Sequence, residues 1–206
     1  MPKIAYSDKD KENIKKELIR VGLELMAKQG IQHTTVEQVY KEVGISRTFF
    51  YSFFPTKEDL VMESLYLQQP KIIEYIKKLM ASSNSSWKDK VKQFLYTCCY
   101  GEKNGIVVLT IEEQQLLFKR LSKESYQLFR QKQFRLFGDI LLNLGIKPDT
   151  EIVNLFINLI LTVMIVKRAI PDTLPLFVPE AANDTVEFQI NAIVEALDKI
   201  RSDSKN

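Results

Sequence analysis

The sequence predicts an all-α protein, with a small three-helix domain at the N-terminal end and a larger helical domain behind it. Apolar residues recur at the three- and four-residue spacing of helices, and no segment alternates apolar and polar residues convincingly over the length of a strand. Glycine and proline number only seven each among 206 residues, so few positions interrupt a helix. We place the domain boundary near residue 65, which gives domains of residues 1–65 and 66–206.

The first helix is predicted from about Asp8 to Gln29. Gly30 follows it and suits a Schellman ending, in which Ile31 would pack back on the helix. The apolar residues of this segment share one face at 4-3-4 spacing; they are Ile14, Leu18, Val21 and Leu25.

The second helix has a clear start signal, because Thr35 and Gln38 have the spacing of a capping box. Gly44 is expected to end this helix with a positive φ. Ser46 is then the N-cap of a third helix, which Pro55 prevents from continuing.

A fourth helix is predicted from the cap Thr56 to about residue 69, where Pro70 should interrupt it. The remaining helices are expected over residues 71–81, 87–101, 105–120, 122–144, 149–169 and 184–201. A serine-rich linker at 82–86 and a proline-containing loop before the last helix separate some of them.

The third helix is predicted despite its local sequence. Phe49–Phe54 reads FFYSFF, and five aromatics in six positions have the propensity of a strand. On a helix, however, Phe50 and Phe54 share a face and can be buried together. We expect this packing to override the strand propensity, and Phe49 and Phe53 then lie on a neighbouring stripe that need not be buried.

The segment from Thr35 to Phe54 has the pattern of a helix-turn-helix, whose second helix enters the major groove of DNA. Arg47 in the first turn of that helix can bind guanine through two hydrogen bonds. Thr48 can reach a base or a phosphate, and the hydroxyl of Tyr51 can reach a phosphate. Lys57, in the first turn of the fourth helix, suits the same anion.

Residues 30–60, GIQHTTVEQVYKEVGISRTFFYSFFPTKEDL, resemble the DNA-binding domain of the TetR family, the tetracycline-repressor-like regulators of bacteria. The resemblance implies a homodimeric repressor that binds a palindromic operator in double-stranded DNA and releases it when a small effector binds. It also implies that Thr35, Tyr51 and Lys57 contact phosphates. The complete set of candidate DNA contacts is Thr35, Ser46, Arg47, Thr48, Phe49, Tyr51 and Lys57.

Three positions depart from the usual pattern of this family. Phe49 replaces a small or polar residue, so it either presses on thymine methyl groups or belongs to the core. Phe53 replaces a tyrosine or histidine and brings no hydrogen-bonding group. Tyr40 replaces an alanine, which alters the distance at which the two motif helices cross. The departures concern base reading rather than the domain itself.

The last two predicted helices carry apolar residues at coiled-coil-like spacing. Such seams either form a four-helix bundle between two subunits or pack inside one chain; the family layout favours the dimer. The candidate interface residues are Phe156, Leu159, Val163, Ile190, Ile193 and Leu197.

An apolar effector pocket is the other expected feature of the larger domain. An aromatic stripe also suits an ordinary core, and Glu112 and Glu113 are expected to face solvent. The candidate pocket residues are Trp87, Phe94, Phe118, Tyr126, Phe129 and Phe137.

Other classes of protein are not favoured. The sequence has no Gly-rich phosphate loop, nucleophile–base pair or metal-ligand spacing, so we expect neither an enzyme nor a bound cofactor or metal. Without a signal peptide, a membrane-length apolar run or a disulfide framework, the expected location is the bacterial cytoplasm. The alternative function is a helical DNA-binding protein that protein partners regulate without a small effector.

Overall fold

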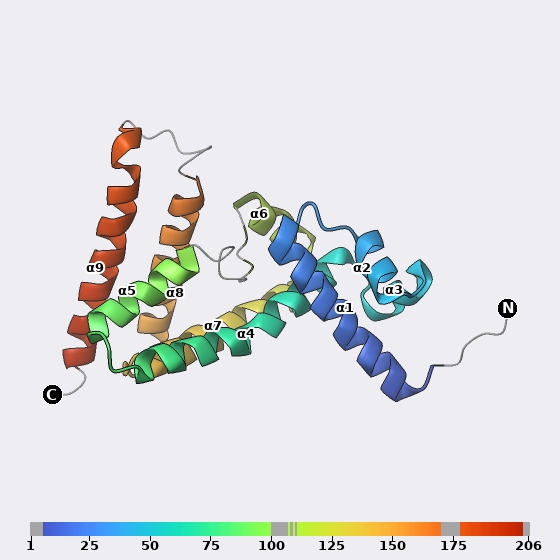
Figure 1. Ribbon diagram of the computed structural model, residues 1–206, viewed down its shortest axis with the longest axis horizontal. Helices are drawn as coiled ribbons and strands as arrows, with labels where there is room; N and C mark the ends of the chain where they lie inside the picture. The colour runs from blue at the N-terminus through green and yellow to red at the C-terminus, as the bar shows by residue number, and fades with distance from the viewer. Residues whose placement is uncertain (1–5, 100–106, 108, 110, 170–177, 204–206) are drawn as a thin grey trace. The chain divides into compact units, whose positions relative to one another are not determined.

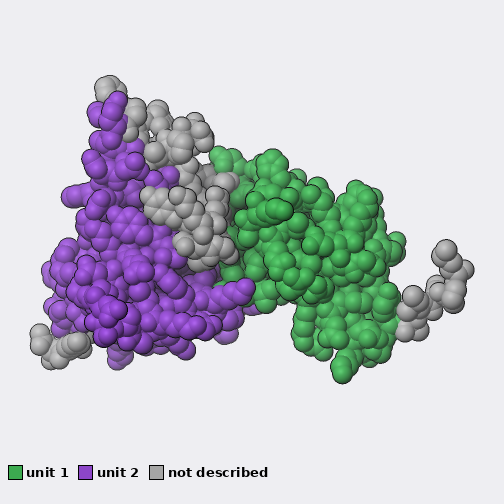
Figure 2. Space-filling model, viewed as in Figure 1, with its two compact units in different colours: residues 1–68, 105–126 green, residues 69–104, 127–206 purple. Residues whose placement is uncertain are grey.

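The computed structural model describes residues 6–99, 107, 109, 111–169 and 178–203. These residues form nine α-helices and one short 3-10 helix, with no strand among them (Figure 1). The all-α prediction is therefore confirmed. The chain divides into two compact units: unit 1 comprises residues 1–68 and 105–126, and unit 2 comprises residues 69–104 and 127–206 (Figure 2).

The first four helices of unit 1 begin where the sequence predicts. Its helices are α1 (Asp8–Gln29), α2 (Val36–Val43), α3 (Arg47–Phe53), the first half of α4 (Lys57–Ala81) and α6 (Ile111–Arg120). The largest fully buried side chains of these segments are Leu18, Phe50, Phe54 and Leu60. The FFYSFF segment is helical because Phe50 and Phe54 are buried at 0% and 2% exposure.

Unit 1 differs from the predicted domain of residues 1–65 because it includes residues 105–126. The sequence separates this segment from the N-terminal helices by a stretch of unit 2, so a division along the chain does not include it. Its helix α6 begins at Ile111, and residues 105, 106, 108 and 110 of the helix predicted over 105–120 lie outside the described residues. The N-terminal unit is thus a three-helix domain extended by part of α4 and by α6.

The prediction that Pro70 ends a helix is wrong. α4 runs without interruption from Lys57 to Ala81 and contains Pro70. An interior proline costs about 3 kcal/mol because it removes one backbone hydrogen bond and crowds the preceding turn. The helix has buried side chains on both sides of this position, Leu65 before it and Ile76 after it. Burial of each such side chain stabilises the fold by about 1.5–3 kcal/mol, which offsets the cost of the proline.

Unit 2 contains the second half of α4 together with four further helices. They are α5 (Trp87–Cys99), α7 (Lys123–Asn143, apart from its first turn), α8 (Thr150–Ala169) and α9 (Ala182–Asp203), which the 3-10 helix Pro179–Ala181 precedes. One hydrophobic core joins all of them. The part of the predicted proline loop at residues 170–177 lies outside the described residues.

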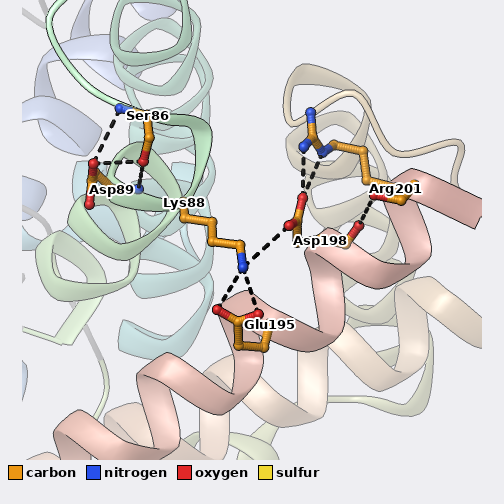
Figure 3. A network of polar contacts seen from close by, with 7 residues as sticks. Ser86, Lys88, Asp89, Glu195, Asp198 and Arg201 are labelled. Carbon is orange, nitrogen blue, oxygen red and sulfur yellow. Dashed lines mark hydrogen bonds and ion pairs between the residues drawn. The ribbon is translucent and has the colours of Figure 1, made fainter.

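Polar contacts fasten α9 to α5 at the edge of this core (Figure 3). The Lys88 ammonium lies 2.6 Å from a Glu195 carboxylate oxygen and 3.4 Å from one of Asp198. Asp198 also pairs with Arg201 at 2.7 Å. The Arg201 guanidinium in turn lies over the ring of Trp87, 4.3 Å from its centroid.

The core of unit 2 corrects the predicted dimer seam. Five of the six predicted residues are buried inside the chain itself, at 0–4% exposure; they are Phe156, Val163, Ile190, Ile193 and Leu197. Their side chains have almost no surface left for a second copy. The sixth, Leu159, is half-buried beside the same core. The 4-3-4-3 spacing therefore marks the packing of α8 and α9 within one subunit.

Candidate nucleic-acid interface

The turn between α2 and α3 has the geometry that the sequence predicts. The Thr35 hydroxyl accepts a hydrogen bond from the Gln38 amide at 3.2 Å, and the Gln38 side chain accepts one from the Thr35 amide at 2.8 Å. Gly44 ends α2 with φ 76°, in the left-handed region that favours glycine. The Ser46 hydroxyl caps α3 by accepting a hydrogen bond from the Phe49 amide at 3.2 Å.

Burial divides α3 into two faces. Phe50 and Phe54 hold it against unit 1, with ring centroids 5.7 Å apart. Arg47, Thr48 and Tyr51 are exposed on the rest of its surface, as Ser52 is. Three of the predicted DNA contacts thus lie on one short helix that two buried rings anchor.

Arg47 and Tyr51 form a pair on this exposed surface. The Arg47 guanidinium lies over the Tyr51 ring, 5.8 Å from its centroid, at the distance of a cation–π contact. Tyr51 itself meets the buried Phe50 ring edge-on, with centroids 5.3 Å apart. The contacts run from the core to the arginine and restrict the orientations of its side chain.

Thr35 and Ser46 are exposed, and each already acts as a helix cap. The Ser46 hydroxyl, which accepts from the Phe49 amide, keeps its own hydrogen as a donor, whereas the Thr35 hydroxyl donates its hydrogen to the side-chain oxygen of Gln38 at 3.1 Å. On α2, Lys41 pairs with Glu37 at 2.6 Å and lowers the pKa of that carboxyl. The positive charge of Arg47 lowers the same pKa further.

Lys57 occupies a less open position than the sequence suggests. It is half-buried, and its ammonium donates a hydrogen bond of 2.6 Å to the carbonyl of Ile31. Burial is the main cause that lowers its pKa, with Glu58 and Glu113 acting in the opposite direction. An ammonium has three donors, so a phosphate remains within its chemistry, but one donor is already committed.

Hydrogen bonds to α6 hold the segment between α1 and α2, and the sequence does not predict these contacts. Gly30 has the expected positive φ of 82°, but its ψ of 161° does not form the Schellman ending. The Ile31 amide, which would donate back to α1 in that motif, donates to the Glu113 carboxylate at 3.0 Å. The Gln32 amide reaches the same oxygen at 3.3 Å.

Glu113 therefore corrects the expectation that both glutamates of this stretch face solvent. Its residue exposure is 8%, whereas Glu112 is exposed. On the same helix, Arg120 pairs with Glu58 at the start of α4, at 2.8 Å. No local pattern reports these contacts, because the partners lie 62 and 82 residues apart in the sequence.

The six predicted pocket residues are divided between the two units. Phe118 and Tyr126 belong to unit 1 and contact each other, with ring centroids 5.3 Å apart. Phe94 and Phe137 are buried in the core of unit 2. Trp87 packs against that core and donates its indole N–H to the Leu144 carbonyl at 2.8 Å.

The remaining pocket candidate, Phe129, is half-buried on α7 in unit 2.

Burial raises the pKa of Cys98 to about 12 and that of Cys99 to about 11, so neither thiol is a reactive thiolate near neutral pH. Among the described residues, no group of three or more His, Cys, Asp or Glu residues could hold a metal ion.

Comparison with known proteins identifies this arrangement of helices. The family model of bacterial regulatory proteins of the tetR family matches residues 18–63, which include α2, the turn and α3. This N-terminal segment is therefore of the TetR family. A TetR-family transcriptional regulator from Pectobacterium atrosepticum has the same fold, with a TM-score of 0.56 and 13% identity over 91% of this chain and 94% of that one.

Two curated relatives are 28% identical to this chain. One is the uncharacterized HTH-type transcriptional regulator YuxN of Bacillus subtilis, aligned over 66% of this chain and 46% of the relative. The other is the nucleoid occlusion factor SlmA of Haemophilus ducreyi, aligned over 58% and 57%. The chain spans about half the length of the curated relatives it matches.

Proposed function

We propose that this TetR-family regulator is a repressor that binds a palindromic operator as a homodimer and releases it when a small effector binds. The observation that carries DNA binding is α3 itself. Its buried Phe50 and Phe54 anchor a helix that presents Arg47, Thr48 and Tyr51 to solvent. A helix anchored in this way can lie in the major groove with its first residues on base edges.

The proposed contacts divide by chemistry. Arg47 reads guanine through two hydrogen bonds, and Thr48 contacts a base or a phosphate. Thr35, Ser46, Tyr51 and Lys57 bind phosphates and fix the register of the protein on the duplex. A dimer carries two such surfaces, so its half-sites lie about 34–36 Å or a multiple of this apart.

We expect Arg47→Ala to weaken binding to the preferred sequence by about 1–3 kcal/mol and to relax the preference at one base of each half-site. Selection from a random DNA pool by the full-length protein supplies that sequence, and fluorescence anisotropy then measures each variant. Arg130→Ala is the control, because it removes the same charge from an exposed position on α7 in unit 2. Equal affinities of Arg47→Ala and the wild type would contradict the assignment.

For the proposed dimer we infer a different surface from the seam that the sequence predicts. Thr150–Lys167 of α8 is long and apolar enough to cross a membrane, yet only 22% of it is buried. Core packing alone therefore leaves much of this apolar helix uncovered. Leu155 on α8 is 50% exposed, and Phe188 on α9 is 74% exposed. We propose that a second copy of the chain covers these outer faces of α8 and α9.

The wild type should sediment as a dimer at micromolar concentration, and Leu155→Glu with Phe188→Glu should sediment as a monomer. Each substitution places charges in an apolar interface that offers no partner for them, so the dissociation constant should rise at least about 100-fold. Leu142→Glu is the matched control, since Leu142 is 56% exposed on α7. A monomeric wild type, or a double variant that stays dimeric, would contradict this interface.

The alternative is a DNA-binding regulator controlled by protein partners without a small effector. This alternative is supported by the packing of Phe94, Phe137 and Trp87 in or against the core of unit 2. A screen of small molecules against the selected DNA complex separates the two cases, because an effector must lower the affinity for DNA. The proposed location is the cytoplasm, where a transcriptional regulator meets its DNA.

A further inference from the structure

Three aromatic rings form a continuous strip along α3. Tyr6 precedes the Ser7 cap of α1 and stacks on Phe49, with ring centroids 4.7 Å apart and planes inclined by 14°. Phe49 meets Phe53 nearly edge-on, with centroids 5.0 Å apart and planes at 65°. We call Tyr6, Phe49 and Phe53 the aromatic strip.

The aromatic strip is not part of the buried core. Phe49 and Phe53 are half-buried, whereas their neighbours Phe50 and Phe54 are buried. Each residue of a helix is turned by about 100° from the next, so Phe49 lies between the buried face and exposed Thr48. The strip therefore borders the surface that carries the proposed DNA contacts.

Tyr6 has a partner that its place in the sequence does not predict. An apolar residue just before a helix cap commonly packs on the first turns of its own helix. Tyr6 instead reaches a residue 43 positions away on α3. Because stacking restricts the orientations of both rings, the strip presents Phe49 in a defined position beside the exposed face of α3.

The chemistry of the strip selects what it can read. Phe49 and Phe53 offer neither a donor nor an acceptor, so they cannot recognise the polar edge of a base. The methyl group of thymine is the apolar feature that distinguishes base pairs in the major groove. We propose that Phe49 contacts a thymine methyl group and that Tyr6 is a positioning residue that holds its ring; this rests on the DNA binding proposed above.

The test replaces thymines in the selected operator by deoxyuridine, one symmetric pair at a time. This change removes only the methyl group and leaves the hydrogen-bonding edge intact. The wild type is expected to lose about fourfold in affinity per buried methyl at one position of each half-site. Phe49→Ala should bind the thymine and uracil forms of that position equally, and Phe49→Leu should retain part of the discrimination.

Tyr6 is tested on the same pair of DNAs. Tyr6→Ala should reduce the discrimination between thymine and uracil while retaining the binding that Arg47 provides. Tyr6→Phe should restore the discrimination, since it keeps the stacked ring. Thermal unfolding of each variant accompanies the titrations, and unfolding midpoints within about 3 °C of the wild type exclude a general loss of structure.

The outcomes separate the two proposals. A wild type that selects no sequence from the pool refutes DNA recognition itself. A wild type that selects an operator but tolerates uracil at every position refutes thymine reading by the strip. Discrimination that survives in Phe49→Ala refutes the role of Phe49, and full discrimination in Tyr6→Ala refutes the role of Tyr6.

Discussion

Replacing Phe50 by alanine is expected to lower the free energy of unfolding by about 3–5 kcal/mol and to abolish DNA binding. Phe50 is 0% exposed and lies at the centre of α3, where its ring contacts the rings of Tyr51 and Phe54. Truncation removes the apolar contacts of the ring and leaves a cavity that a seven-residue helix can fill only by shifting. A domain of this size has about 5–15 kcal/mol of stability in total, so this loss is a large part of it.

The measurement is urea unfolding followed by circular dichroism, together with binding to the selected DNA. Phe53→Ala is the matched control, because it removes the same side chain one turn away from a half-buried position. We expect it to cost clearly less, and Phe50→Leu to recover most of the loss. If Phe50→Ala and Phe53→Ala were equally stable, buried packing would not be what makes FFYSFF helical.

The same segment shows how far the sequence leads. Strand propensity and helical burial make opposite predictions for FFYSFF, and the four-residue spacing of Phe50 and Phe54 decides between them. The predicted helix starts are close to those observed: α1 spans Asp8–Gln29 as predicted, and the predicted caps Thr35 and Ser46 are the caps of α2 and α3. These features are local, so the sequence contains all the information they need.

The errors concern features that local sequence does not determine. Pro70 carries a real cost, but contacts with other helices on both sides of it decide whether α4 continues. Likewise, the spacing of Ile190, Ile193 and Leu197 shows that α9 has a buried face. Spacing alone does not tell whether the same chain or a second copy covers that face.

Replacing Glu113 by alanine is the second change with a large expected effect. The Glu113 carboxylate accepts hydrogen bonds from the amides of Ile31 and Gln32, in the segment that joins α1 to α2. A hydrogen bond to a charged acceptor contributes about 1.5–3 kcal/mol, and partly buried donors left without a partner add their desolvation cost. We expect Glu113→Ala to destabilise unit 1 by about 2–4 kcal/mol.

Hydrogen exchange of the full-length protein localises this effect. The Ile31 and Gln32 amides should exchange much faster in Glu113→Ala, since local opening now costs less free energy. Glu113→Gln keeps an acceptor oxygen in the same place and should retain most of the protection. Glu112→Ala is the exposed control on the same helix, with an expected change within about 0.5 kcal/mol.

The consequence for DNA binding follows from the position of the clamped segment. The carbonyl of Ile31 accepts a hydrogen bond from the Lys57 ammonium, and the amide of Ile31 donates one to Glu113, so side chains of both α4 and α6 hold the backbone of Ile31. Thr35, the cap of α2, follows Ile31 by only four residues. A short turn then joins α2 to α3. Loosening the segment should therefore weaken binding to all DNA sequences alike, because it mispositions α2 and α3 without changing any reading side chain. A selective loss at one base in Glu113→Ala would contradict this and would instead indicate a direct change at Arg47 or the aromatic strip.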